Sequence, residues 1–463
     1  MENNKTNFSE WYNEIIDIAK LSDKRYNIKG MNVWLPYGLK IMHSIDSLLR
    51  EYSSDSGIEE VSFPVLISRE QLEVEFEHVK GFENEIYWVT KGGTTPLDID
   101  LALRPTSEAA MYTMFPLWIR SHTDLPFRIF QIVNVYRYET KHTRSFIRVR
   151  EIHFYEAHTA HRDFDDAERQ MDDYLKIMER LSNDLCINFS MDIRPDWDKF
   201  PGAMYSVAFD TPMPGYRSLQ IGTIHEYGEN FAKNYGIKYL DEKGDMNYVS
   251  QTTFGLSERL MAAVIGIHGD DRGLVLPYKL APVQVIIVPI PGENYDEILE
   301  YSNSIHSKLR EIGIRCQVDT SDYTPGYKFN DWEMKGVPVR IEIGKREVAE
   351  KTVTISLRTR KKKIRAELED IRDMYEYLQE VNSDIQAKAS EFYRANTLFI
   401  DSMEKINEDK MIMAYWCGSK GCSDKIEEIS EKAALGAIRN INLSGPCIVC
   451  GKPGKMSSFS RTY

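Results

Sequence analysis

The chain has 463 residues, of which 42% are hydrophobic and 28% are charged, which is typical of a globular protein with several domains rather than a disordered or fibrous one. Its net charge of −13 excludes indiscriminate binding to nucleic acids or acidic membranes, because a uniformly acidic surface repels a polyanion. The N-terminus lacks the basic and apolar segments of a signal peptide, and no apolar run reaches the roughly 20 residues that span a bilayer. We therefore expect a cytoplasmic protein with no membrane partner.

Hydrophobic periodicity over residues 1–281 predicts a mostly antiparallel sheet with helices at its sides. Apolar residues at helical spacing predict helices at 35–52, 163–185 and 256–270. Segments rich in β-branched and aromatic side chains predict strands at 58–68, 85–90, 125–139, 145–161, 205–211, 217–226 and 249–255. Pro64 lacks the N–H that a central strand needs, so strand 58–68 is placed at an edge or an interface.

Strands alternate with helices in the second part of the chain, residues 282–386, as is typical of a small α/β domain. Strands are predicted at 281–290, 315–320, 337–344 and 351–358, and helices at 295–312 and from residue 364 onward. Residues 387–463 form a third unit with a different composition. The predicted fold class is therefore a multidomain α/β (α+β) protein.

A predicted hairpin at residues 135–151 carries unusually many charges for part of a sheet. Because side chains alternate along a strand, the return strand presents one face with a mixed set of side chains: Phe146, Arg148, Arg150, Ile152, Phe154, Glu156 and His158. Arg137 and Glu139 share a face of the outgoing strand. The hairpin is either solvated, with charges that pair across the strands, or it lines a concave pocket for a polyanion and an ammonium group.

Three further segments carry polar side chains at the ends of predicted elements. Thr106 and Glu108 precede a helix, where capping alone would explain them. Arg259 stands at a strand-to-helix junction, where it either caps the helix or pairs with a surface acid, or reaches an anion lying across the sheet. The third segment contributes Gln220, Thr223 and His225, and a lone histidine more often has a structural role than a ligand.

One region of the acidic chain is strongly basic. Residues 335–365 contain eleven lysines or arginines against three glutamates. This region is either the solvated rim of a strand–turn–strand unit or a surface that faces phosphate groups.

Four of the six cysteines lie in the last 50 residues. Cys417 and Cys422 are separated by four residues, and Cys447 and Cys450 by two. In a cytosolic protein such pairs indicate a metal site before they indicate disulfides, and four thiolates suit tetrahedral Zn²⁺. The alternative is four reduced cysteines that hold no metal.

Several of these segments, taken in order, resemble the class II aminoacyl-tRNA synthetases. "YRYE" at 136–139 with "FIRVRE" at 146–151 resembles motif 2 of that family, "FGLSER" at 254–259 resembles motif 3, and "VSFPVLIS" at 61–68 looks like motif 1. The resemblance implies an antiparallel catalytic core at 1–281. It also implies a homodimer, because the motif 1 proline, here Pro64, lies at the dimer interface in that family.

Within that class the chain resembles the prolyl-tRNA synthetases of the archaeal and eukaryotic type, over nearly its whole length. The similar segments are "LRPTSE", "ETKHTRSFIRVREIHFYEAHTAH", "DKFPGA", "IGTIHEYGENFAK", "HGDDRGLVLP", "APVQVIIVP" and "KFNDWEMKGVPVRIEIG". The resemblance implies an anticodon-binding domain at 282–386 and a C-terminal zinc-bearing α/β domain at 387–463. The chain departs from the family at Phe154, where a tryptophan is common, and in "IHEYGEN".

By this resemblance, two arginines carry the catalysis of prolyl-adenylate formation. Arg137 would bind the α-phosphate of ATP and the attacking carboxylate, and Arg259 would hold the outer phosphates and stack on the adenine. The residues implied to bind ATP are Arg137, Glu139, Phe146, Arg148, Gln220, Thr223 and Arg259. The residues implied to bind proline are Thr106, Glu108, Arg137, Phe154, Glu156, His158 and His225. Mg²⁺ is implied by the polyphosphate, without assigned ligands.

The resemblance also implies contacts with tRNA(Pro). Lys141 and Arg144, in the loop between the two halves of motif 2, are expected to meet the acceptor end, and Glu333 and Arg340 lie where the anticodon would be read. Tyr463, the last residue, can reach toward the active site in the family. Only about 100 residues separate motifs 2 and 3, which leaves no room for an editing insertion.

Two other functions remain open from the sequence. One is another class II synthetase of the threonyl type, which would use zinc inside its amino-acid pocket rather than at the C-terminus. The other is a synthetase-like RNA-binding paralogue without catalysis, against which the presence of Arg137, Glu139 and Arg259 counts.

Overall fold

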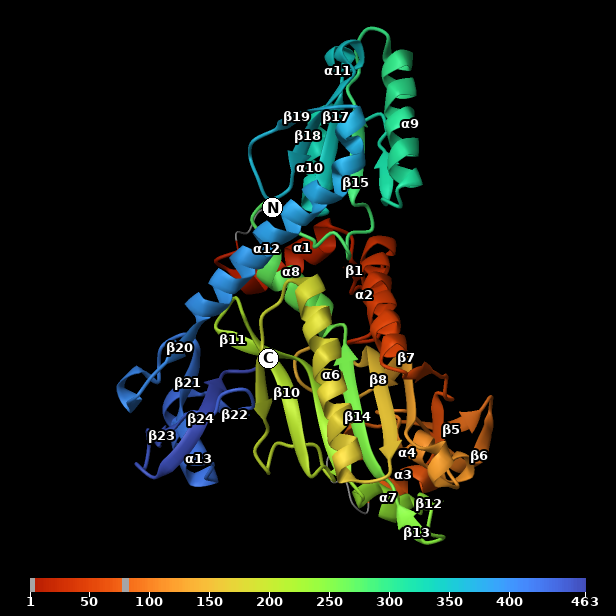
Figure 1. Ribbon diagram of the computed structural model, residues 1–463, viewed down its shortest axis with the longest axis vertical. Coiled ribbons are helices and arrows are strands. Elements are labelled where there is room, and N and C mark those ends of the chain that lie inside the picture. The colour runs from red at the N-terminus through yellow and green to blue at the C-terminus, as the bar shows by residue number, and fades with distance from the viewer. Residues whose placement is uncertain (1–4, 77–82) are drawn as a thin grey trace.

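The computed structural model describes residues 5–76 and 83–463, and it is built around one large sheet (Figure 1). Twelve strands form this sheet, and most neighbours run antiparallel. One half of it falls in residues 1–281, where the sequence predicts a catalytic core, and is called the catalytic half below. This half contains, in spatial order, β9 (Ser190–Ile193), β10 (Tyr205–Met213), β11 (Arg217–Gly228), β14 (Ser250–Ser257), β8 (Glu151–His161), β7 (Phe127–Tyr136) and β3 (Glu59–Glu60). The mostly antiparallel sheet predicted for this part of the chain is confirmed.

Helices cover one face of this half of the sheet and enclose the largest hydrophobic core. These helices are α1 (Phe8–Ile18), α2 (Pro36–Asp55), α6 (Phe164–Leu185) and α8 (Arg259–His268). Pro36 stands in the first turn of α2, and the side chain of Asp163 caps α6 by accepting from the Asp166 N–H. The sequence predicted α2, α6 and α8, but it did not predict α1.

The opposite side of the catalytic half carries short elements and a second core. The helices there are α3 (Arg69–Phe76), α4 (Glu108–Tyr112), α5 (Phe115–Trp118) and α7 (Asn230–Tyr235). Two small sheets lie beside them: β4 (Leu66–Ser68) with β6 (Thr95–Leu103) and β5 (Tyr87–Gly92), and β12 (Lys238–Leu240) with β13 (Met246–Tyr248). A third, β1 (Ser22–Asp23) with β2 (Val33–Trp34), lies next to α1 and the largest core instead. The predicted strand 58–68 is split into β3 and β4, and exposed Pro64 belongs to neither.

A separate five-stranded sheet with its own core forms the upper part of Figure 1. Its strands in spatial order are β16 (Cys316–Val318), β15 (Val285–Pro289), β17 (Val339–Ile343), β18 (Thr352–Leu357) and β19 (Ile364–Glu367). Its helices are α9 (Tyr295–Glu311), α10 (Pro325–Met334) and α11 (Lys345–Glu350). The predicted alternation of strands and helices is confirmed, although neither α10 nor α11 was predicted.

The helix predicted from residue 364 is wrong at its start. Residues 364–367 form β19, which pairs with β18, and α12 (Met374–Asn396) begins only at Met374. Ala366 faces the core while its two neighbours do not, which is the period of a strand and not of a helix. Figure 1 shows α12 running from the upper sheet to the C-terminal strands, so the boundary expected at 386/387 falls inside this helix.

The C-terminal unit, residues 397–463, extends the catalytic sheet. It contains β20 (Thr397–Phe399), β21 (Met411–Trp416), β22 (Ala433–Ile438), β23 (Ser444–Pro446), β24 (Pro453–Ser460) and α13 (Lys420–Ser430). Strand β22 pairs with β9, so the two units share one continuous sheet, a join that the sequence did not predict. Within the ranges described, no helix is both long and apolar enough to cross a membrane.

Candidate active site

A cavity of about 450 Å³ lies over β8, β11 and β14 on the side opposite the main helices. All thirteen side chains predicted to bind ATP or proline line it: Thr106, Glu108, Arg137, Glu139, Phe146, Arg148, Phe154, Glu156, His158, Gln220, Thr223, His225 and Arg259. They come from four segments that are far apart in the sequence. The pocket interpretation of the charged hairpin therefore holds over the solvated one.

The backbone of the charged hairpin differs from the two strands that periodicity predicted. Strand β7 ends at Tyr136 and β8 begins at Glu151, so residues 137–150 form a loop rather than two strands. Phe146 has a φ of +64°, which breaks the alternation of faces, and the loop closes on itself through the Arg137 N–H, which donates to the Arg150 carbonyl at 2.9 Å. Arg150, predicted on the same face as Arg148, does not line the cavity.

One end of the cavity is anionic and tightly hydrogen-bonded. Glu156 accepts from Ser107 Oγ and from Gln131 Nε2 at 2.8 Å, and its other oxygen lies 3.3 Å from His158 Nε2. Glu108 accepts from Thr106 Oγ1 and from the Tyr227 hydroxyl at 3.0 Å. The helix start at Ser107 has no side-chain cap, so capping does not explain Thr106 and Glu108.

Both carboxylates are almost fully buried, which is costly unless their charge is compensated. Burial opposes ionisation of Glu156, but the hydrogen bonds from His158, Ser107 and Gln131 lower its pKa below the ordinary value. Burial lowers the pKa of His225 to about 3, so this histidine is a neutral wall. The end formed by Glu108 and Glu156 therefore suits a small cation that brings its own hydrogen-bond donors.

The other end of the cavity is cationic. Arg259 is partly buried, its Nε donates to the Ile147 carbonyl at 2.8 Å, and its Nη1 donates to the Gln220 carbonyl at 3.3 Å. Burial, followed by the charges of Arg148 and Arg137, lowers the pKa of Arg259 to about 10. Three arginines held together in this way repel one another, and a polyanion between them would relieve that repulsion. The guanidinium of Arg259 donates to two backbone carbonyls at the cavity rather than to a surface acid.

Arg148 connects this end of the cavity to two other groups. Its Nη1 donates to Glu139 Oε2 at 2.6 Å, and its Nη2 donates to the main-chain oxygen of Tyr463 at 2.7 Å. The Tyr463 N–H in turn donates to the Ser218 carbonyl at 3.2 Å, which brings the C-terminal residue beside β11, as the C label in Figure 1 shows. The expected approach of Tyr463 to the active site is thus present.

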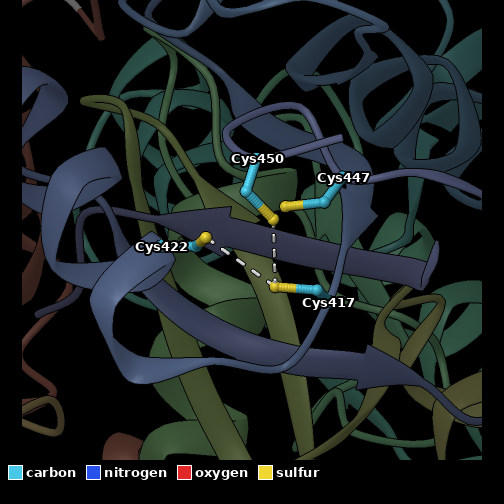
Figure 2. Close-up of side chains that lie close together, drawn as sticks. All are labelled: Cys417, Cys422, Cys447 and Cys450. Carbon is cyan, nitrogen blue, oxygen red and sulfur yellow. Dashed lines mark hydrogen bonds between the residues drawn. The ribbon is translucent and has the colours of Figure 1, made fainter. Parts of the chain in front are cut away.

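The four C-terminal cysteines gather their sulfur atoms at one point (Figure 2). Cys417 Sγ lies 3.7 Å from both Cys422 Sγ and Cys450 Sγ, and all four sulfurs lie within 4.8 Å of one another. Four sulfurs at about 2.3 Å from a tetrahedral zinc ion would be separated by about 3.8 Å. The cluster is therefore compatible with zinc in both ligand type and spacing.

A second, smaller cavity of about 220 Å³ lies in the upper domain. It is lined by Glu333 and Arg340, which were predicted to contact tRNA. Further cationic side chains line it, and all but Arg272 belong to the basic region 335–365: Arg272, Arg358, Arg360, Lys361 and Lys363. Trp332 adds an aromatic surface. Lys141 and Arg144, the other predicted tRNA residues, line neither this cavity nor the first one.

Comparison with known proteins assigns this architecture to a family. Three family descriptions match in order: "tRNA synthetase class II core domain (G, H, P, S and T)" over residues 87–268, "Anticodon binding domain" over 284–378, and "Prolyl-tRNA synthetase, C-terminal" over 400–463. The chain is 64% identical to a proline–tRNA ligase of Picrophilus torridus, with 100% of both chains covered. The chain belongs to the proline–tRNA ligase family. A member from Pyrococcus abyssi is 50% identical over 99% of this chain and 98% of its own.

Solved structures of the family share the whole fold. A prolyl-tRNA synthetase of Giardia lamblia in complex with prolyl-adenylate has a TM-score of 0.96 and 32% identity, and the match covers 100% of this chain and 99% of that one. The Cryptosporidium parvum enzyme complexed with L-proline and AMP has a TM-score of 0.93 and 30% identity, covering 100% and 97%. The predicted fold class and family are confirmed, and a threonyl-type family is not supported.

Several cavity residues were missed from the sequence although the family segments contain them. Asp198, Lys199 and Phe200 belong to "DKFPGA", whose resemblance was noted without assigning any role. Arg194 and Glu258 also line the cavity. Arg194 directly follows a short strand, between Ile193 and Pro195, and a charged residue between apolar neighbours is itself a signal of a functional or structural partner.

Proposed function

We infer that this chain is a proline–tRNA ligase, which activates proline with ATP and transfers it to the 3′ end of tRNA(Pro). The observation that carries this inference is the single cavity with a carboxylate end and an arginine end, in a chain whose full-length relatives are named proline–tRNA ligases. The carboxylate end fits the ammonium of an amino acid, and the arginine end fits a polyphosphate. The test is pyrophosphate exchange into ATP that depends on proline.

In the first step, a carboxylate oxygen of proline attacks the α-phosphorus of ATP, and the bond to the bridging oxygen breaks, which releases pyrophosphate and leaves prolyl-adenylate. Both reactants are anions, so cations must hold them together. Arg137 lies between the two ends of the cavity in this proposal and binds the α-phosphate and the carboxylate. Arg148 and Arg259 hold the departing phosphates, and no side chain acts as a nucleophile.

The adenosine is placed by side chains on the arginine side of the cavity. Glu139 accepts from the adenine amino group, and Phe146 and Arg259 stack on the two faces of the ring. Gln220 and Thr223, on β11, complete this part of the site. Phe146 is already fixed for this role, because its ring lies 4.7 Å from that of Trp34 and is almost fully buried.

Proline is recognised by charge and by shape. Glu108 and Glu156 accept from its secondary ammonium, Thr106 supplies a hydroxyl, and Phe154, His158 and His225 wall the apolar ring. A pocket of fixed shape discriminates weakly against smaller amino acids, because one methylene is worth only about 1–3 kcal/mol. With no editing insertion between motifs 2 and 3, the chain is expected to activate alanine slightly and to lack efficient hydrolysis of alanyl-tRNA, which a deacylation assay would detect.

Magnesium would accompany the ATP polyphosphate, and one carboxylate in the cavity fits it. Glu258 is buried beside Arg259, and its Oε2 has no hydrogen-bond partner among the described residues. Carboxylate oxygens are the protein ligands that Mg²⁺ prefers. When bound there, the ion would neutralise phosphate charge, and Glu258 would hold it in place. The Glu258→Gln protein is therefore expected to need a higher Mg²⁺ concentration for exchange, which assays at varied Mg²⁺ measure.

The transfer step requires the 3′ ribose hydroxyl of tRNA to attack the prolyl carbonyl, which expels AMP. Lys141 is exposed in the loop 137–150, whereas Arg144 already donates to Ser9 Oγ and stacks on the Tyr463 ring. We propose that Lys141 meets the acceptor end of the tRNA. The second cavity, with Glu333 and Arg340, would receive the anticodon.

Lys141→Ala is expected to slow prolyl transfer up to about fivefold, the loss of one exposed ion pair of up to about 1 kcal/mol. Proline-dependent exchange without tRNA is expected to stay within twofold, since Lys141 lies outside the cavity. Single-turnover transfer from preformed prolyl-adenylate measures the first rate. The control is Lys243→Ala, which removes an exposed lysine from a turn elsewhere in the chain. Equal losses of the exchange rate and the transfer rate in Lys141→Ala would exclude a tRNA contact of Lys141.

Zinc is proposed as the structural ion of the cysteine cluster. The purified chain is expected to contain one zinc ion, and Cys447→Ser is expected to reduce it below about one tenth, because three thiolates leave the tetrahedron open. Elemental analysis and the melting of the C-terminal unit measure this. Cys316→Ser, in the upper domain, is the matched control; a Cys447→Ser protein with full zinc content would contradict the proposal.

A homodimer is proposed through the segment around Pro64. Apolar side chains are exposed there and nearby: Val65, Leu66, Leu117 and Trp118. The Phe63 and Trp118 rings, 5.8 Å apart, tie this segment to α5, so the exposed side chains belong to one region. Light scattering would show the mass of one chain if this proposal is wrong. The domain boundaries at 281/282 and 386/387 and the cytoplasmic location stay predictions.

A further inference from the structure

A cluster of buried charges lies where the C-terminal unit joins the catalytic sheet. Asp192 is on β9, Arg194 directly follows that strand, and Asp210 is on β10; all three side chains are almost fully buried. Figure 1 shows β22 and β24, in blue, next to this edge of the catalytic half. Burying charges is unfavourable unless each finds a partner, and a sheet edge joined by backbone bonds alone would not need them. The cluster therefore calls for a specific role.

Arg194 is the centre of the cluster, and its guanidinium contacts three different elements. Its Nη1 donates to the Leu435 carbonyl of β22 at 2.8 Å, and its Nη2 lies 2.9 Å from Asp210 Oδ2. The same Nη2 donates to Gln220 Oε1 on β11 at 3.1 Å. One side chain thus connects the C-terminal unit with the end of the cavity that is proposed to hold the nucleotide.

The C-terminal side of this connection is held rigidly. Asp192, two residues from Arg194, accepts from Ser190 Oγ and from Ser458 Oγ of β24. Gly436, which follows Leu435, has a φ of +135°, and a Cβ there would lie 2.0 Å from the Ile193 carbonyl oxygen. Only glycine permits this approach, so β22 and β9 are in fixed register and the Leu435 carbonyl has a fixed place beside Arg194.

The contact with Gln220 determines which way its carboxamide faces. Arginine only donates hydrogen bonds, so the oxygen of Gln220 must face Arg194, and the amide NH₂ must face the other way. Both side chains line the cavity. Without Arg194, the carboxamide could rotate and present either its oxygen or its nitrogen to a ligand. With it, the site offers donors in one orientation, which suits the oxygens and ring nitrogens of a nucleotide.

We propose that Arg194 is a positioning residue for nucleotide binding: it fixes the carboxamide of Gln220 as a donor toward ATP, and the C-terminal unit holds Arg194 through Leu435. This inference rests on the proposed function. It gives the C-terminal unit a part in the binding of ATP that is separate from the contact between Tyr463 and Arg148. Arg194 itself does not need to touch the reacting atoms.

The test compares Arg194→Lys with Arg439→Lys in proline-dependent pyrophosphate exchange. Lysine keeps the charge beside Asp210 but cannot reach three acceptors at once. Arg439 is also an arginine at this seam, since its N–H donates to the Met191 carbonyl, but it does not line the cavity. Arg194→Lys is expected to raise the KM for ATP about tenfold with the KM for proline within twofold, and Arg439→Lys is expected to change neither.

A double-mutant cycle with Gln220→Ala shows whether Arg194 acts through Gln220. In the Gln220→Ala protein, Arg194→Lys is expected to change the KM for ATP by less than twofold. If the two changes multiply, or if Arg194→Lys in a folded protein leaves the KM for ATP unchanged, the proposal is wrong. It is also wrong if the KM values for ATP and proline rise together, as a general structural role predicts.

Melting curves decide whether the variants are folded. If the Arg194→Lys protein is not folded, Asp210→Asn replaces it in the same cycle. This change keeps the shape of the side chain but removes the carboxylate that anchors Arg194. An effect that reaches ATP through Arg259 instead would persist in the Gln220→Ala background and would contradict the proposal. Failure of the proposed function looks different, because the unmodified chain would then show no exchange with proline.

Discussion

Replacing Arg137 by alanine is expected to lower the rate constant of proline-dependent pyrophosphate exchange by about 10³-fold, the size reported for loss of one preorganised donor to a developing charge. The reason is the repulsion between the proline carboxylate and the α-phosphate, which Arg137 compensates only when both are in place. The arginine is held for this purpose, because its Nε donates to the Pro105 carbonyl at 3.1 Å. Exchange at saturating ATP and proline measures the effect.

Arg25→Ala is the control for the Arg137 variant, since it removes an arginine whose side chain is 88% exposed. Its exchange rate is expected to equal that of the unmodified chain. Arg137→Lys should recover part of the lost rate, because it restores the charge but not the two-pronged geometry. Loss of less than tenfold in Arg137→Ala, with normal melting, would show that Arg137 does not bind the reacting groups.

Replacing Glu156 by glutamine is expected to raise the KM for proline by about 100-fold and to leave the KM for ATP within twofold. A hydrogen bond to a charged partner contributes about 1.5–3 kcal/mol, and tenfold corresponds to about 1.4 kcal/mol. Glutamine keeps the shape of the side chain and can still accept from Ser107, but it removes the charge that faces the ammonium. Exchange at varied proline and fixed ATP gives the two constants.

The control for the Glu156 variant is Glu179→Gln on the exposed side of α6, which removes a carboxylate far from the cavity. The melting temperature must also be measured, because His158 loses a charged partner in Glu156→Gln. A KM for proline that does not change, or an equal rise in both KM values, would mean that Glu156 shapes the cavity without binding the amino acid.

Thirteen of the side chains that line the cavity were predicted through the resemblance to a family, others such as Arg194 were missed, and the geometry was predictable only in part. Long strands with β-branched and aromatic residues, such as β7 and β8, were found because their period is undisturbed over ten or more residues. The loop between them was predicted as a continuation of the two strands, with the same alternation of side chains. Phe146, in the left-handed region, ends that continuity, and no residue type at 146 signals it, since the conformation is imposed by packing against Trp34 and by the loop's own bonds.

The join between the C-terminal unit and the catalytic sheet could not be predicted from local pattern. Strands β9 and β22 have four and six residues, and their pairing crosses more than 200 residues of chain. Periodicity carries no information about such distant partners. Gly436 and Arg194 are the residues in the sequence that this pairing requires. Their roles can be assigned only when the neighbouring strand is known.

The start of α12 was misplaced for a related reason. Residues 364–373 contain both alternating and helix-favouring side chains, and helix propensity alone favours the wrong boundary. In the folded chain, residues 364–367 form a strand because β19 pairs with β18, which buries Ala366 in the core of the five-stranded sheet. Tertiary contacts thus override local preference at this boundary.

The most direct measurement of the central claim is ATP–pyrophosphate exchange by the purified chain with each amino acid in turn. The structure and the relatives predict exchange that is strongest with proline, weak with alanine and absent with threonine, and that disappears in Arg137→Ala. Exchange driven by threonine, or no exchange with any amino acid by a folded chain containing an intact cavity, would contradict the assignment of this protein as a proline–tRNA ligase.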